Sequence, residues 1–110
     1  MSPWLLLLIA ILLEVAGTTA MRMIGGWNVA SIPAIVTMLG LWGGSLATVT
    51  LVIKRLDIGV TYAVWSGIGT VATALVGYAA FAEPLSLMAV VCMGLIVLGV
   101  VGLNLSRAPA

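Results

Sequence analysis

Four long apolar stretches divide this chain of 110 residues, and they constrain its fold more than any other feature. They cover residues 4–21, 33–53, 59–81 and 85–105. A helix needs about 20 apolar residues to cross a hydrocarbon core of about 30 Å. Only 6% of the residues are charged, so too few polar side chains are present to cover a surface in water. The sequence therefore predicts an all-α membrane protein, a single domain over residues 1–110 with four transmembrane helices and short loops.

Other classes of protein find little support in the sequence. Histidine is absent and Cys92 is the single cysteine, so we expect no catalytic centre, no metal site and no cofactor. The formal net charge of +1 argues against nucleic-acid binding. Residues 1–13 contain no Lys or Arg, which argues against a cleaved signal peptide.

The few basic residues give a modest indication of orientation. Lys54, Arg55 and Arg107 fall on the side of the membrane that would hold both termini, and Arg22 alone falls on the other. Cytoplasmic loops carry the excess of Lys and Arg. We therefore expect both termini in the cytoplasm, although one added or lost lysine would change the balance.

Glu14 lies in the middle of the first apolar stretch, "PWLLLLIAILLEVAGTTAM". A charged group at mid-membrane costs on the order of 3 kcal/mol, and intramembrane acids usually have a function. Removal from water disfavours the charged form. A proton and an organic cation would therefore compete for this carboxylate, which is the minimum requirement for proton/cation exchange. The alternative is a neutral Glu, or one paired with Thr18 or Ser66, that only fixes helix packing.

Small residues share the helical face of Glu14. Ala10, Gly17 and Thr18 lie on it, together with the larger Ile11. These small side chains leave room for a cavity beside the carboxylate. They would equally allow another helix to approach closely, and the sequence does not separate the two interpretations.

The third stretch contributes an aromatic face. Tyr62, Trp65, Ser66 and Gly69 follow the spacing i, i+3, i+4, i+7. Aromatic faces attract cations by about 0.5–2 kcal/mol, depending on desolvation. An acid and an aromatic wall would together form a receptor for an apolar cation. Ordinary packing is the alternative, and Tyr62 lies close enough to the membrane boundary to belong to an interfacial aromatic belt.

Two further features each allow two interpretations. Gly67 and Gly69 could form a hinge in the third helix, or they could permit close packing. Trp42, in the second stretch, could line a substrate cavity or face lipid.

The fourth stretch carries no ionisable group and favours association with another chain. Cys92 and Gly99 are seven residues apart and share a face, with Ile96 between them. Small residues on one face let helices approach closely in lipid. Four short helices enclose too little volume for both a substrate and a gate, so we expect an oligomer in which each subunit contributes Glu14.

Three segments of the chain resemble the small multidrug resistance transporters. They are "EVAGTTAMR" from Glu14, "YAVWSGIGT" from Tyr62, and "LIVLGVVGLN" from Leu95. The resemblance extends over nearly the whole chain. It implies a dimer of two antiparallel subunits in the bacterial inner membrane that exchanges protons for cations, with Glu14 shared by proton and substrate.

The resemblance also implies roles for individual residues. The family's multidrug branch exports quaternary ammonium compounds and aromatic dyes, whereas its guanidinium-exporting branch typically has Trp after the Glu-Val pair, where this chain has Ala16 and Gly17. The matching positions are Ala10, Ile11, Gly17 and Thr18 for the multidrug branch, Tyr62, Trp65 and Ser66 for the third-helix site, and Leu95, Ile96, Gly99 and Val100 for the dimer contact.

Some positions depart from the family pattern. Arg22 replaces the usual Lys, and Cys92 replaces a Gly of the dimer motif. The drug-contacting tyrosine of the second helix is missing, and Leu41 and Trp42 occupy that neighbourhood. These departures put the drug spectrum in doubt and leave open both a homodimer and a heterodimer with a related small subunit.

The sequence as a whole predicts a proton-coupled antiporter that exports lipophilic or quaternary ammonium cations. One alternative is an exporter of guanidinium-type metabolites from the same family. A second is a non-transporting membrane assembly or chaperone subunit, which needs only packing faces. A pore is less favoured, because it would leak ions with no exchange stoichiometry.

Overall fold

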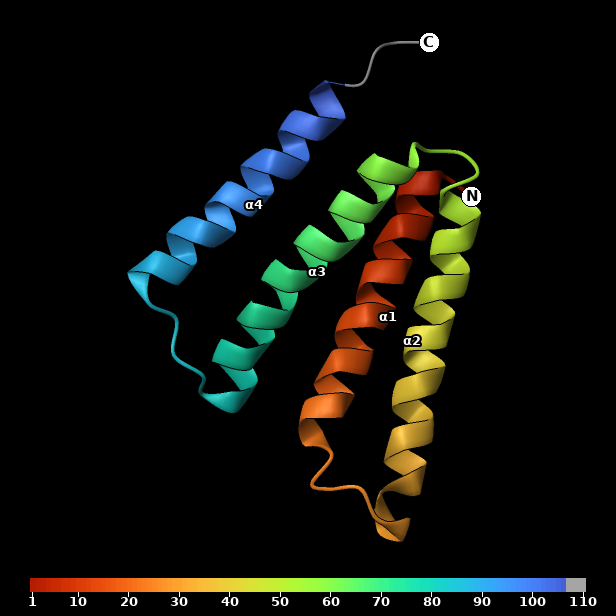
Figure 1. Cartoon of the computed structure of the whole chain (residues 1–110), viewed down its shortest axis with the longest axis vertical. Helices are drawn as coiled ribbons and strands as arrows, with labels where there is room; N and C mark the ends of the chain where they lie inside the picture. The colour runs from red at the N-terminus through yellow and green to blue at the C-terminus, as the bar shows by residue number, and fades with distance from the viewer. Residues whose placement is uncertain (107–110) are drawn as a thin grey trace.

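A computed structural model describes residues 1–106 and shows four α-helices and one short 3₁₀ helix in that range, with no strand. The helices are α1 (Pro3–Met23), η1 (Val29–Ser31), α2 (Ile32–Val52), α3 (Ile58–Phe81) and α4 (Leu87–Leu105) (Figure 1). All four α-helices are long and apolar enough to cross a membrane. The predicted all-α membrane fold is confirmed, and the helix ends lie within two residues of the predicted spans. Arg107, used above for orientation, lies outside the described residues.

Local chemistry explains where the helices begin and end. The Ser2 side chain accepts a hydrogen bond from the Trp4 amide, and Ser86 accepts one from the Ala89 amide in the same way. Side-chain acceptors of this kind satisfy amides that have no partner in the first turn of a helix. At the other end of α3, Ala82 adopts a left-handed conformation (φ 54°) that stops the helix and turns the chain toward α4.

The helices alternate in direction, and α1 packs against both α2 and α3 (Figure 1). Leu7 and Ile11 of α1 form a small buried cluster with Val52 at the end of α2, and Trp65 of α3 packs against it. This cluster joins the first half of α1 to the end of α2 and to α3. The site described below lies beside this cluster.

Helix α4 packs against α3 and diverges from α1 and α2 (Figure 1). None of its residues, Leu87–Leu105, is buried against the rest of residues 1–106. A mostly apolar helix that its own chain covers on one side only is stable where lipid or another chain covers the rest.

Candidate functional site

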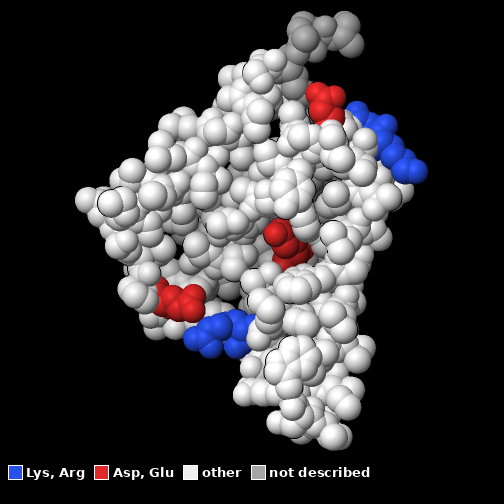
Figure 2. All heavy atoms as spheres, viewed as in Figure 1, with Lys and Arg blue, Asp and Glu red and all other residues white. Residues whose placement is uncertain are grey.

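Glu14 lies in the middle of α1 with its carboxylate against α3. A Cβ atom built on Gly69 would overlap the carboxylate, so α3 can approach only because this residue is glycine. The Oε2 atom is shielded from solvent and accepts no hydrogen bond from residues 1–106. Figure 2 shows one acidic side chain alone in a hollow of this face, between mixed charges at two edges. A shielded carboxylate oxygen with no donor is a strong acceptor for a proton or a cation.

A cavity of about 240 Å³ opens beside this carboxylate. Its walls come from three helices, with two indole rings, two hydroxyls and one leucine around the acid. The lining residues are Glu14 and Thr18 of α1, Trp42, Ser45 and Leu46 of α2, and Trp65 of α3. One carboxylate among aromatic rings is a composition that suits an organic cation with an apolar surface.

Two hydrogen bonds fix the ring of Trp65 in the wall. Its indole Nε1 donates to Ser45 Oγ at 2.9 Å, and that hydroxyl donates to the Ala10 carbonyl at 2.7 Å. Ser45 is only 1% exposed, so both bonds are protected from water. These two hydrogen bonds connect α3 to α2 and α2 to α1. Their last acceptor, Ala10, lies four residues before Glu14 in the sequence.

The second indole is held by a different contact. Trp42 lies against Gly17, where a Cβ atom would overlap its ring, and its Nε1 donates to Thr18 Oγ1 at 3.4 Å. Of the two sequence interpretations of Trp42, the structure gives the cavity wall. Gly17 therefore acts through its lack of a side chain, and Thr18 holds a wall residue rather than the acid.

The other residues expected near Glu14 on α1 serve the packing. Ala10 and Ile11 are both buried, and Ile11 belongs to the buried cluster with Leu7 and Val52. Ala10 contributes its carbonyl to the Ser45 bond. Neither side chain lines the cavity.

Two aromatic-face residues predicted from the sequence lie outside this cavity. Tyr62 is 63% exposed, and its ring lies 5.9 Å from that of Trp65. The hydroxyl of Ser66 donates to the Tyr62 carbonyl of its own helix at 2.7 Å. Within this chain, Ser66 is therefore not a partner of the Glu14 carboxylate.

Of the residues expected to form the hinge and the dimer contact, some pack between α3 and α4 of the same chain and others are exposed. Gly67 faces α4, since a Cβ there would lie about 3 Å from Ile96 and Val100. Helix α3 is continuous through Gly67 and Gly69, and both glycines lie at close approaches; a hinge stays a prediction. Leu95 and Gly99 are exposed on α4.

Ser45 and Leu46 line the cavity and were not predicted from the sequence, and Ser45 is the one that makes hydrogen bonds there. In the sequence, Ser45 follows Gly43 and Gly44 in the second apolar stretch and carries no pattern that marks it as part of a site. The available signal was a hydroxyl deep in an apolar span, which must find a partner in lipid. Which partner it finds depends on the register between α1 and α2, and the sequence does not give that register.

Comparison with known proteins decides the family. Residues 2–96 match the family model described as Small Multidrug Resistance protein. The chain belongs to the small multidrug resistance family. Its family membership and four apolar helices make it a multi-pass bacterial membrane protein.

Relatives in the small multidrug resistance family carry different names. An "Uncharacterized membrane protein YvaE" of Bacillus subtilis is 46% identical, with 93% of this chain and 84% of that protein aligned. A "Quaternary ammonium compound-resistance protein QacE" of Escherichia coli is 40% identical over 100% of this chain and 99% of its own. A "Guanidinium exporter" of Yersinia pseudotuberculosis is 36% identical over 94% and 97%.

Proposed function

We propose that this protein is a proton-coupled antiporter that exports lipophilic or quaternary ammonium cations, with Glu14 as the group that proton and substrate share. The observation that carries the proposal is the shielded Glu14 Oε2, which has no hydrogen-bond donor among residues 1–106 and faces a cavity with two indole walls. The name of the quaternary ammonium resistance relative supports the substrate class.

The chemistry follows from competition for one carboxylate. Ionised Glu14 attracts a cation, and the rings of Trp42 and Trp65 contact its apolar surface. Protonation of Glu14 removes that attraction, so the cation leaves. Because the low-polarity surroundings disfavour an unpaired charge, the carboxylate holds either a proton or a cation at each step. Exposure of the site to each side of the membrane in turn would couple proton entry to drug exit.

The direct test is proton release when a cation binds. Tetraphenylphosphonium added to the detergent-solubilised protein in weakly buffered solution should displace protons from Glu14. Glu14→Gln should release none, because the amide cannot ionise. The matched control is Asp57→Asn, which removes an exposed acid that caps no amide at the start of α3, and it should release as many protons as the native chain. Equal proton release from Glu14→Gln and the native protein would refute the proposal.

Export of guanidinium-type metabolites is the second candidate. Relatives named "Guanidinium exporter" align with 94% of this chain at 36–37% identity. Competition distinguishes the two functions: a multidrug site should hold tetraphenylphosphonium in the presence of millimolar guanidinium, and a guanidinium site should lose it. A non-transporting assembly subunit would bind neither cation and release no proton.

We also propose that the working unit is a dimer, with two identical chains or two related small subunits in antiparallel orientation. The exposed surface of α4 supports this proposal, since the helix is apolar apart from Asn104 and its exposed residues include Leu95 and Gly99. Each chain of the dimer would then contribute one cavity and one Glu14 carboxylate.

A further inference from the structure

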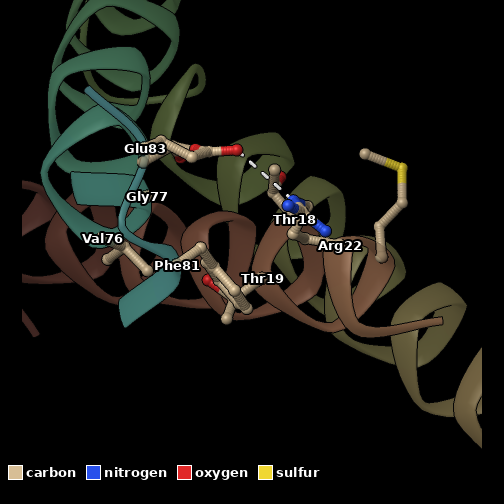
Figure 3. A pocket seen from close by; sticks show the side chains of 9 residues that line it. Thr18, Thr19, Arg22, Val76, Gly77, Phe81 and Glu83 are labelled. Carbon is tan, nitrogen blue, oxygen red and sulfur yellow. Dashed lines mark hydrogen bonds and ion pairs between the residues drawn. The ribbon is translucent and has the colours of Figure 1, made fainter. Parts of the chain in front are cut away.

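A second pocket, which we call the Glu83 pocket, lies at the end of the helices where α1 finishes and α3 turns toward α4. It has a volume of about 370 Å³ and is lined by Thr18, Thr19, Arg22, Thr73, Phe81 and Glu83, among others. Figure 3 shows the Glu83 carboxylate and the Arg22 side chain pointing toward each other across it. The central cavity at Glu14 shares only Thr18 with this pocket.

The Glu83 pocket already holds a guanidinium group, that of Arg22. Arg22 Nε lies 3.3 Å from Glu83 Oε2, and Arg22 Cζ lies 5.2 Å from the centre of the Phe81 ring. A carboxylate and an aromatic face thus contact one planar cation together. Guanidinium groups are well suited to this combination because they bind carboxylates and stack on rings.

Backbone geometry aims the Glu83 carboxylate into the pocket. The left-handed Ala82 ends α3, and the Glu83 amide donates to the Gly77 carbonyl at 3.1 Å. The Glu83 side chain then folds over Gly77, where a Cβ atom would overlap Oε1. The negative end of the α3 dipole lies at the same place, so carboxylate and dipole both favour a cation there.

The hold on Arg22 is weak enough for exchange. The Arg22 and Glu83 side chains are 58% and 51% exposed, and exposed ion pairs contribute little net free energy. Another cation can therefore replace Arg22 without breaking a buried contact. Arg22 would swing out into water, which solvates its charge.

A third cavity connects this pocket with the central site. It has a volume of about 380 Å³ and is lined by both Glu14 and Glu83, with Thr18, Gly69, Thr70 and Thr73 between them. Its walls carry three threonine hydroxyls, which can solvate a cation that has left water. The two carboxylates therefore line one open cavity, and a cation could move along it from one to the other.

We propose that the Glu83 pocket is a capture site for organic cations, in which a guanidinium or small ammonium group displaces Arg22 from Glu83 and Phe81 before it passes through the third cavity to Glu14. The capture step stands on the pocket itself, and the passage to Glu14 rests on the proposed function. Arg22 is then an internal competitor that keeps the pocket closed until a cation arrives.

The binding test uses chains in which Glu14→Gln silences the central site. Methylguanidinium is titrated into detergent-solubilised protein while the amide NMR signals of Gly77 and Glu83 are followed. Removal of the competitor in Glu14→Gln with Arg22→Gln should tighten binding about fivefold relative to Glu14→Gln alone, equivalent to about 1 kcal/mol. The control is Glu14→Gln with Lys54→Gln, which removes one positive charge elsewhere and should leave the affinity unchanged.

The decisive chain carries Glu14→Gln, Arg22→Gln and Glu83→Gln together. It should lose the saturable shift of the Gly77 signal, and circular dichroism should show the helix content of the other variants. Persistence of the shift without Glu83, or no saturable shift with Arg22 removed, overturns the capture site.

Transport separates this proposal from the function on which its second half rests. In vesicles with Glu14 intact, Glu83→Gln should slow uptake of tetramethylammonium, a small quaternary ammonium cation, at low concentration and leave the saturated rate unchanged. An unchanged rate at low concentration overturns the passage step. If Glu14→Gln vesicles still exchanged protons for cations, the proposed function would be refuted. The capture site at Glu83 would not be affected by that result, because it is tested by the binding experiment alone.

Discussion

At the scale of single residues, the two serines near the site have different roles. Ser45 links Trp65 of α3 to the Ala10 carbonyl of α1, whereas Ser66 bonds only within its own helix. The cavity wall therefore depends on a hydroxyl of α2, and the position of one indole ring depends on that hydroxyl.

Ser45→Ala should weaken binding of an aromatic cation. The variant removes the acceptor of the Trp65 indole N–H at a position that is shielded from water, so the ring loses its fixed position. The loss of one such hydrogen bond, at about 1 kcal/mol, predicts a three- to tenfold rise in the Kd for tetraphenylphosphonium. Equilibrium binding of the radiolabelled cation to purified protein measures it.

The matched control is Ser66→Ala, which removes a hydroxyl of the same kind one residue after Trp65. It should leave the Kd close to that of the native chain. A larger effect from Ser66→Ala than from Ser45→Ala would contradict the assignment of the two hydroxyls.

At the scale of the helices, glycines set how closely the elements approach each other. Gly17 makes room for the Trp42 ring, Gly69 for the Glu14 carboxylate, and Gly67 for side chains of α4. Each is a position where a side chain would have to enter space that a neighbour occupies. The glycines of α3 lower its helix propensity, yet α3 is continuous, and Gly67 and Gly69 are the points where it closely approaches other parts of the chain.

Gly69→Ala should disturb the site without unfolding the protein. The added methyl group would overlap the Glu14 carboxylate, so either the acid changes rotamer or α3 moves away, at a cost of about 1–3 kcal/mol. We expect proton release by tetraphenylphosphonium to fall at least about tenfold. Gly40→Ala is the control, because a Cβ there would meet no described atom within 4 Å, and proton release should persist.

At the scale of the whole molecule, one helix, α4, is covered by its own chain only on the side that packs against α3. Helix α4 has no buried residue in the described chain, although all of its residues except Asn104 lack a polar side-chain nitrogen or oxygen. The three helices that form the cavity thus lie apart from the surface that another chain would cover. This division lets two chains associate through α4 while the cavities stay free of that contact.

Gly99→Leu should weaken dimerisation. A Cβ at Gly99 would meet no described atom within 4 Å, so the larger side chain fits the single chain and clashes only with a helix packed closely from outside. The dimer fraction in detergent, measured by cross-linking or by light scattering, should decrease. Gly94→Leu is the control on a different face of α4, and it should leave the dimer fraction unchanged. An equal decrease in both variants would argue against a specific contact at Gly99.

The sequence alone determined the fold class, because helix is the simplest way for an apolar span of about 20 residues to satisfy its backbone in lipid. It also singled out Glu14 as a candidate, because a charge in a membrane span is costly and is usually functional. These inferences need only local composition and length.

Only the tertiary structure decided which side chains meet around that acid. Trp42, Ser45 and Trp65 come together because three helices pack in one register, and a rotation of any helix would change the set. Tyr62 and Ser66 share the helical spacing of Trp65 but do not line the cavity, because Tyr62 is exposed and the Ser66 hydroxyl bonds within its own helix. The Arg22–Glu83 pair joins residues 61 positions apart and could not be predicted from the sequence. The Glu83 carboxylate reaches Arg22 because of the left-handed turn at Ala82, which ends α3.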